Sequence, residues 1–214
     1  MRGRRRFLKV AAAAVASGAY CAAAQESRII SDGAGRKVAI PRRIERIYAA
    51  GPPASILVFA VAPDKLIGWT WAWRVPERPF IGKKYADLPT LGRLTGRGNT
   101  ANVEVVMQAK PDVIIDYGSV RPTLASLAER VQEQTGIPYL LLDGDFDRMV
   151  EAILLTGRIA SEQKRAEALA RYARETVADI NRRVAGIPAG KRPRIYYGRG
   201  PQGLMTGLSG SISA

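Results

Sequence analysis

Short apolar runs alternate with amphipathic stretches between residues 44 and 142. Four of these runs are rich in large aliphatic or β-branched residues and are bounded by Gly, Pro, Asp or Lys. That pattern is typical of strands buried in a parallel sheet. The predicted strands cover residues 44–49, 66–70, 113–117 and 139–142.

Helical spacing of apolar residues occurs in the intervals between these runs. It predicts helices over residues 54–62, 102–109 and 123–135. Proline or glycine punctuates each of them, most clearly at Gly136, which follows the third. Regular alternation of strand and helix predicts an α/β fold with a doubly wound parallel sheet and right-handed crossovers.

Residues 146–185 depart from this alternation, because they are almost continuous helix-forming sequence with one weak point at 157–161. We therefore predict two helices, the second with Ser161 as its N-cap. At about 1.5 Å per residue the second helix would be on the order of 35 Å long, about the width of a small domain. Its apolar stripe, at spacings of three and four, consists of Ala166, Leu169, Ala170, Ala173, Val177, Ile180 and Val184.

A strand-like run at residues 194–197 follows Pro188 and Pro193 and predicts the start of a second sheet. The predicted organisation has three parts after the first 24 residues. These are an N-terminal α/β lobe at 25–145, linking helices with a rigid backbone helix at 146–187, and the beginning of an incomplete second α/β lobe at 188–214.

The first 24 residues are typical of an export signal. A basic segment precedes an Ala-rich, uncharged run that ends at Ala24, where cleavage is expected. The run is shorter than the roughly 20 residues of a membrane-spanning helix. Residues 4–9 resemble the twin-arginine export motif, and a general secretory signal is the alternative. The expected location is the periplasm, or the cell surface if Cys21 is lipidated.

The formal net charge of +14 raises nucleic acid as a partner. However, five of the 33 basic residues lie in the first nine positions, and the others are interspersed with 19 acidic residues. Such mixing is typical of an ordinary solvated surface. No nucleic-acid partner is therefore expected.

The chain contains no histidine and a single cysteine. Histidine-dependent catalytic triads and His-ligated zinc are thereby excluded. One cysteine can form neither an internal disulfide nor a cysteine-based zinc site. These absences favour binding over catalysis, and neither a cofactor nor a protein-held metal is expected.

Four motifs resemble those of the substrate-binding proteins of ABC importers for siderophores, haem and cobalamin, and they follow one another in the order found in that family. The resemblance extends from about Ile29 to the last residue, and its most recognisable motif is Asn102-Val103-Glu104 followed by residues 109–115. The other three matches are to the family's opening strand, its first loop and helix, and its next strand, at residues 40–47, 51–57 and 63–68.

The resemblance implies two α/β lobes joined by one rigid helix, with ligand held in the cleft between them. It implies a monomeric, non-enzymatic protein that captures an iron chelate, a haem-like ligand or a corrinoid and delivers it to a membrane permease. The chain ends soon after the first predicted strand of the second lobe. A C-terminal lobe cut short is therefore expected.

Ligands of open α/β sheets bind beyond the carboxyl ends of the strands. The loops there offer small residues for close approach, aromatic rings that suit flat chelates, and arginines that could pair with an anion. Tyr117 could also coordinate ferric iron. Core packing of the tryptophans and solvation of the arginines are the alternatives. The predicted ligand-binding residues are Gly51, Pro52, Trp69, Trp71, Trp73, Arg74, Arg93, Tyr117, Gly118 and Arg199.

The resemblance also implies a docking residue. In the family a glutamate on each lobe forms salt bridges with arginines of the permease, and the N-terminal member corresponds to Glu104. The alternative is that Glu104 only complements the dipole at the start of its helix.

Two other interpretations remain open. A histidine-free periplasmic enzyme would use Asp116, Asp143, Asp145 or Asp147 as acid and base groups, and a truncated remnant would bind nothing. The G-x-G-x-x-G spacing at residues 198–203 is not expected to bind a dinucleotide, because Pro201 removes a backbone N–H and no helical pattern follows.

Overall fold

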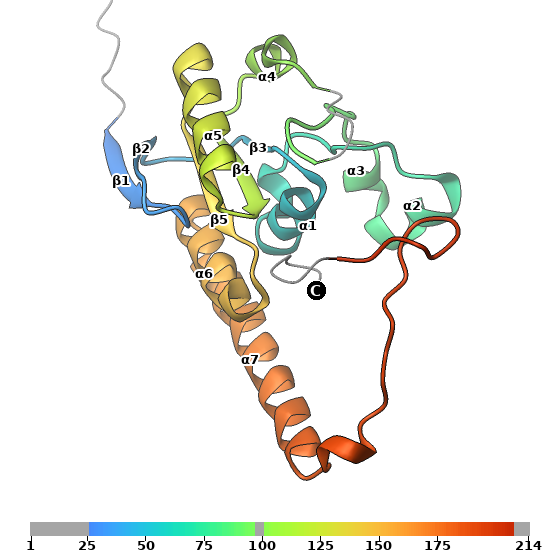
Figure 1. Cartoon of the computed structure of the whole chain (residues 1–214). Helices are drawn as coiled ribbons and strands as arrows, with labels where there is room; N and C mark the ends of the chain where they lie inside the picture. Colours follow the sequence, from blue (N-terminus) through green and yellow to red (C-terminus); the bar gives the residue numbers. More distant parts are fainter. Residues whose placement is uncertain (1–25, 97–100, 208–214) are drawn as a thin grey trace, which may run out of the picture.

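The computed structural model describes residues 26–96 and 101–207, so the predicted export signal, including Cys21, lies outside the described residues. A three-stranded parallel sheet forms the centre of the molecule (Figure 1). It contains β3 (Ile47–Ala49), β4 (Val113–Gly118) and β5 (Tyr139–Asp143), in the order β3-β4-β5. All three were predicted from their apolar runs, although β3 is shorter than expected.

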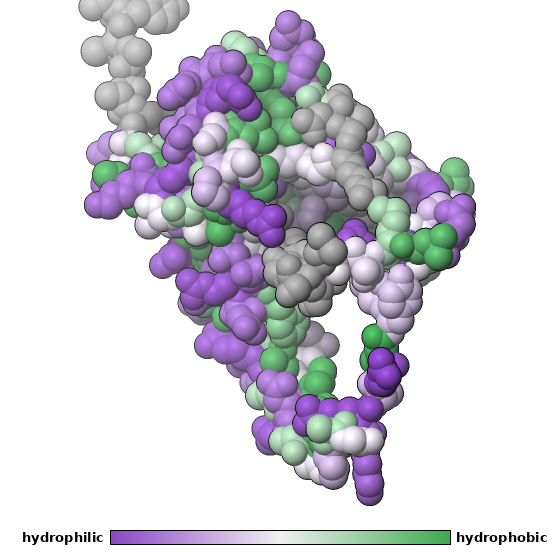
Figure 2. Space-filling view, in the orientation of Figure 1, coloured by the Kyte–Doolittle hydropathy of each residue, from purple (hydrophilic) through white to green (hydrophobic). Residues whose placement is uncertain are grey.

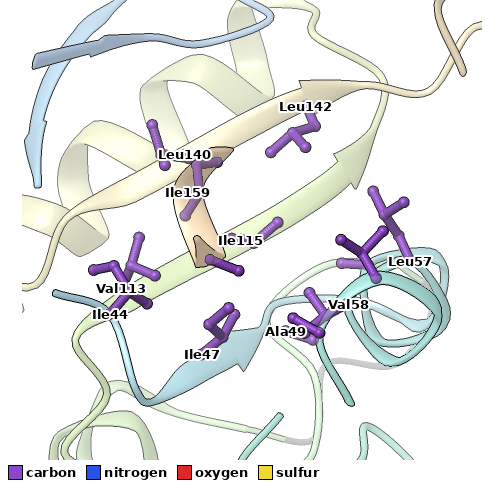
Figure 3. Packing of buried hydrophobic residues seen from close by; sticks show 14 of the residues in the cluster. Ile44, Ile47, Ala49, Leu57, Val58, Val113, Ile115, Leu140, Leu142 and Ile159 are labelled. Atoms are coloured by element: carbon purple, nitrogen blue, oxygen red, sulfur yellow. The ribbon is translucent and has the colours of Figure 1, made fainter. Parts of the chain in front are cut away.

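Successive side chains of these strands enter two different cores, as the alternation of a strand requires. On β4, Val113 and Ile115 face one core and Ile114 faces the other. Leu140 and Leu142 of β5 join the first core, together with Ile47 of β3 (Figure 3). Because both faces are buried, β4 begins with three consecutive apolar residues and β5 with four, and each forms a continuous apolar run in the sequence.

Helices cover both faces of the sheet and confirm the predicted doubly wound arrangement. One face carries α1 (Pro52–Val61), α6 (Met149–Ala160) and the first turns of α7 (Gln163–Ala185). The opposite face carries α4 (Val103–Ala109) and α5 (Pro122–Thr135).

Local signals place the ends of two helices. The Asn102 side chain accepts a hydrogen bond from the Val105 N–H at 3.0 Å and so caps α4. Gly136 ends α5 with a φ of +69°, a left-handed conformation that glycine adopts without strain.

An antiparallel hairpin of β1 (Ser27–Ser31) and β2 (Lys37–Pro41) precedes the sheet and was not predicted. Its sequence signal is the alternation of Val38 and Ile40, both buried, with exposed neighbours. The turn is attached to β5 by the buried carboxylate of Asp32, which accepts a hydrogen bond from the Leu141 N–H at 3.2 Å.

The strand predicted at residues 66–70 does not form, and this prediction is wrong. The segment changes partners half-way. Leu66 bridges to Ile47 of β3, whereas Trp69 exchanges backbone hydrogen bonds with Pro89 and Leu91. A continuous ladder needs one neighbour along its length. Short helical turns follow at Val75–Glu77, Arg78–Ile81 (α2) and Lys83–Ala86 (α3), with an earlier one at Pro63–Lys65.

Two helices occupy residues 149–185, as predicted, but Ser161 is not the N-cap of α7. It ends α6 in a left-handed conformation, with φ +57°, and α7 begins after Glu162 without a side-chain cap. Gly157 lies inside α6, and it permits close helix packing. A Cβ there would come within 2.3 Å of the Ala166 Cβ on α7.

The C-terminal half of α7 extends away from the sheet (Figure 1). Ala166 and Ala170 of the predicted stripe are fully buried, but Ile180 and Val184 further along are 52% and 38% exposed. Apolar residues are visible along this half of the helix in the space-filling view (Figure 2). Among residues 26–96 and 101–207, no helix has the length and apolar character needed to cross a membrane.

The strand predicted at residues 194–197 is also absent. After a short turn at Ala189–Lys191, the chain is extended but unpaired until a bridge between Arg199 and Met205. Ile195 is 84% exposed. A run of strand-forming residues such as Ile and Tyr becomes a strand only beside another strand, and the described residues supply none there.

Candidate ligand-binding site

The carboxyl ends of β3 and β4 lie side by side, because the two strands are parallel and Ala49 is paired with Ile115. Ala50 continues this pairing through a 2.8 Å hydrogen bond from its N–H to the Ile115 carbonyl. Gly51 and Pro52 follow and begin α1, while Tyr117 and Gly118 end β4. Four of the predicted ligand-binding residues are thus gathered at one edge of the sheet.

Gly51 makes this edge unusually close-packed. A Cβ at this position would come within 2.6 Å of the Thr95 Oγ1 and 3.5 Å of the Asp116 Oδ1. Gly118 differs, because a Cβ there would meet nothing within 4 Å. The two glycines therefore have different roles: Gly51 allows three segments to meet, whereas Gly118 leaves open space at the end of β4.

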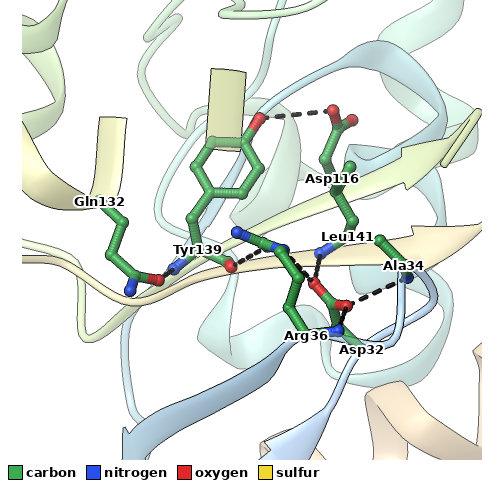
Figure 4. Close-up of polar contacts among 7 residues, drawn as sticks. All are labelled: Asp32, Ala34, Arg36, Asp116, Gln132, Tyr139 and Leu141. Atoms are coloured by element: carbon green, nitrogen blue, oxygen red, sulfur yellow. Dashed lines mark hydrogen bonds and ion pairs between the residues drawn. The ribbon is translucent and has the colours of Figure 1, made fainter. Parts of the chain in front are cut away.

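A buried carboxylate lies directly beneath this edge. Asp116 is 4% exposed, and its oxygens accept hydrogen bonds from the Thr95 hydroxyl at 3.1 Å and the Tyr117 N–H at 3.0 Å. They also accept from the Tyr139 hydroxyl at 3.3 Å, a contact drawn in Figure 4. Burial raises the pKa of Asp116, and these hydrogen bonds partly oppose the rise. The pKa of Tyr139 is raised well above its usual value by burial and by Asp116.

A segment from Leu91 to Thr95 crosses the ends of the strands and carries Arg93. The carbonyl of Ala50 accepts hydrogen bonds from the Leu94 and Thr95 N–H groups, at 2.8 and 3.1 Å. The Tyr48 hydroxyl lies 3.2 Å from the Gly92 carbonyl, to which it donates. Burial raises the pKa of Tyr48 to about 12, so the phenol remains a donor at neutral pH.

The three tryptophans form one aromatic cluster with unequal exposure. Trp69 is 1% exposed, and its indole N–H donates to the Tyr85 carbonyl at 2.8 Å. Trp71 and Trp73 are partly buried, and their ring centroids lie 5.9 and 4.9 Å from that of Trp69. Trp69 is therefore a core residue, and a ligand could reach only Trp71 and Trp73 without unpacking the cluster.

The three predicted arginines do not converge into one described group. Arg74 is exposed and pairs with Glu77 at the next turn. Arg93 is partly buried, and its carbonyl accepts from the Ala101 N–H at 3.1 Å. Arg199 is exposed within a turn whose ends are joined by a 2.6 Å hydrogen bond to Met205. That turn has Gly200 and Gly203 in left-handed conformations and leads into no helix among the described residues.

Tyr117 is partly buried against the first core, and its pKa is raised by burial and by the nearby carboxylate of Asp143. The neutral phenol is favoured as a result, so iron coordination by Tyr117 would require the metal itself to displace the proton. Within the described ranges, no group of three or more Asp, Glu or Cys side chains is arranged to hold a metal ion.

The other aspartates considered at the sequence level lie after β5. Asp143 accepts from the Asp145 N–H at 3.1 Å and lies 3.9 Å from Arg148, whereas Asp145 and Asp147 are exposed. This arrangement is typical of a turn that precedes a helix.

A cavity of about 570 Å³ lies beside this turn, between the β1–β2 turn, the end of β5 and helices α6 and α7. It contains none of the predicted ligand-binding residues.

Glu104 is exposed in the first turn of α4. Its carboxylate lies 3.3 Å from the Asn102 side-chain amide, which donates to it.

Two residues of the buried polar cluster, Thr95 and Tyr139, were not predicted from the sequence. A polar residue inside an apolar strand, as at Asp116, was the one signal that pointed to a buried polar cluster.

Comparison with known proteins shows the family to which the chain belongs. Residues 76–212 match the profile of the periplasmic binding proteins. The chain belongs to the periplasmic binding protein family. An ABC transporter solute binding protein from Sulfurospirillum deleyianum is 30% identical, with a TM-score of 0.74 over 86% of this chain and 58% of the other. No curated protein sequence matches the chain significantly.

Two more distant solved structures share the fold. The molybdate-binding MolA of Haemophilus influenzae is 20% identical, with a TM-score of 0.62 over 78% of this chain and 56% of its own. Staphylococcus aureus SirA, solved with staphyloferrin B, is 20% identical, with a TM-score of 0.54 over 73% and 51%. The chain spans just over half the length of these proteins.

Proposed function

We propose that this periplasmic binding protein is the solute-binding component of an ABC importer, capturing a small ligand and delivering it to a membrane permease. The observation that carries the proposal is the 30% identity to an ABC transporter solute binding protein over 86% of the chain. The parallel-strand edge at Gly51 and Gly118 supports it, because open α/β sheets bind ligands there.

The ligand we propose is an iron chelate, a haem-like macrocycle or a corrinoid. Trp71 and Trp73 support this choice, since partly exposed indole rings suit flat or aromatic ligands. The likeness to SirA, solved with staphyloferrin B, agrees with a chelate, and the likeness to MolA makes molybdate the oxyanion to test beside it. Arg93 and Arg74 would neutralise an anionic ligand.

In this proposal residues 25–145 form the N-terminal lobe, 146–187 link the lobes, and 188–214 begin a second lobe. The exposed distal half of α7 supports a linking role, because its apolar residues Ile180 and Val184 lack cover from the described chain. We further propose that the protein is exported through the twin-arginine route and cleaved near Ala24. It would act as a monomer and dock on the permease through Glu104.

Titration of the purified chain tests the function. The panel is ferric citrate, a ferric catecholate siderophore, haemin, cyanocobalamin and molybdate, followed by tryptophan fluorescence and by calorimetry. Saturable binding of one class, with a rise in melting temperature, is the expected result. If no member of the panel produces heat, a fluorescence change or thermal stabilisation, the chain does not bind these ligands and the proposal fails.

A further inference from the structure

The segment Leu91–Thr95 has no secondary structure of its own, yet Leu94 and Thr95 are only 6% and 9% exposed. At the strand ends, two of its N–H groups donate to Ala50, and its Gly92 carbonyl accepts from Tyr48. These contacts come from β3 and the residue that follows it. Away from the sheet, the Leu91 N–H donates to the Trp69 carbonyl at 2.8 Å, and the Arg93 carbonyl accepts from the Ala101 N–H.

Asp116 supplies the attachment from β4. Its Oδ1 accepts the Thr95 hydroxyl at 3.1 Å and the Tyr117 N–H at 3.0 Å, and its Oδ2 accepts the Tyr139 hydroxyl of β5 at 3.3 Å. The carboxylate thus joins two strands and the crossing segment. A buried carboxylate is costly unless its oxygens are hydrogen-bonded, so these donors reduce the cost of burying Asp116.

The packing around this contact leaves little freedom. The site that a Cβ of Gly51 would occupy is 2.6 Å from the Thr95 Oγ1, so the hydroxyl fits against the start of α1 only because residue 51 is glycine. Thr95 is confined between Gly51 on one side and Asp116 on the other.

We infer that Asp116 is a positioning residue for the ligand-binding site: through the Thr95 hydroxyl, it holds the segment that carries Arg93 in place across the ends of β3 and β4. The effect on ligand binding rests on the proposed function. The structural part, that Asp116 holds the segment in place, concerns the ligand-free protein alone. Asp116 itself is too buried to contact a ligand and acts through Thr95. A preformed segment would spare the ligand the cost of ordering it.

Amide hydrogen exchange in the ligand-free chain tests the structural part. In Thr95→Val, which keeps the shape but removes the donor, exchange of the backbone amides at positions 94 and 95 should accelerate by roughly ten- to a hundredfold. Asp116→Ala should do the same, and Asp116→Asn, which keeps an acceptor oxygen, should restore most of the protection. Thr70→Val is the matched control. Thr70 is 4% exposed, and its hydroxyl lies 3.5 Å from that of Ser55 instead of bonding to Asp116.

Unchanged exchange at positions 94 and 95 in Thr95→Val would overturn the inference, whether or not Asp116→Ala folds. Equal acceleration in Thr70→Val would also overturn it, because the effect would then be general destabilisation. The second readout is the affinity for ferric citrate, which should fall about tenfold in Thr95→Val. If the wild-type chain binds none of the panel while the exchange result holds, the proposed function fails and the positioning role stands.

Discussion

The carboxylate of Asp32 and the guanidinium of Arg36 form a buried ion pair, with 2.7 Å between the Asp32 Oδ2 and the Arg36 Nη2. The Asp32 side chain is fully buried, and it also accepts the N–H groups of Ala34 and Leu141 (Figure 4). The Arg36 guanidinium also donates a hydrogen bond to the Tyr139 carbonyl at 2.7 Å. This pair joins the unpredicted hairpin to β5.

Asp32→Ala should therefore lower the free energy of unfolding by about 3 kcal/mol. It leaves a partly buried guanidinium without its carboxylate, and the backbone N–H groups of Ala34, Arg36 and Leu141 without this acceptor. Urea denaturation measures this. Asp179→Ala, which removes an exposed carboxylate on α7, should change stability by less than about 0.5 kcal/mol. Equal effects of the two substitutions would show that the hairpin is not held by Asp32.

Trp69 and Trp71 should separate folding from binding. Trp69→Ala should destabilise the protein by about 3–5 kcal/mol, since a fully buried ring is lost. Trp71→Ala should cost much less stability but weaken binding of the preferred chelate by about 1–3 kcal/mol. Thermal unfolding and calorimetric titration give the two quantities. Unchanged affinity in Trp71→Ala and Trp73→Ala would remove the aromatic cluster from the site.

Gly51 and Gly118 provide a matched pair of glycine substitutions. Gly51→Ala should destabilise by about 1–3 kcal/mol, because the new methyl group would overlap Thr95. Gly118→Ala meets no atom within 4 Å and should fold normally, with a stability within about 0.5 kcal/mol of wild type. If Gly118→Ala nevertheless impairs chelate binding, the open space at the end of β4 belongs to the site.

The raised pKa of Asp116 predicts a pH effect of definite sign. Because the folded pKa exceeds the unfolded one, the stabilising contribution of this group is present below the unfolded value, about 3.9, and is lost as pH rises through the folded value. Asp116→Asn cannot ionise. Its free energy of unfolding relative to wild type should therefore increase from about pH 4 upward. Tyr139 and Tyr48, which face the same site, stay neutral over this range. A flat difference between the two proteins would contradict the prediction.

Glu104→Arg distinguishes docking from helix stabilisation. Loss of a first-turn carboxylate should cost roughly 0.3–1 kcal/mol of stability. If Glu104 also meets an arginine of the permease, reversal of its charge should abolish most uptake while leaving chelate affinity intact. Glu129→Arg, on the exposed face of α5, is the control. Normal uptake by a folded Glu104→Arg protein would leave only the role at the helix terminus.

Sequence alone determined the parallel strands, the helices between them and the long α7, because each of these has a strong local pattern. The β-branched run at 113–115 requires cover on both faces, and the spacing in 163–185 suits only a helix. Gly136 ends α5 because it adopts the left-handed conformation without strain, and Asn102 begins α4 because its side chain caps the helix.

Tertiary structure decided what depends on a partner distant in the sequence. Residues 66–70 and 194–197 have strand-like compositions, but one changes neighbour half-way and the other has none among the described residues, so neither becomes a strand. Likewise the sequence predicted the same role for Trp69 and Trp71. Only the packing of Trp69 against Phe59 and its hydrogen bond to the Tyr85 carbonyl distinguish a core ring from the partly buried Trp71. The meeting of Thr95 and Asp116 across 21 positions leaves no local pattern, because a hydrogen bond between loops depends on where the whole sheet places them.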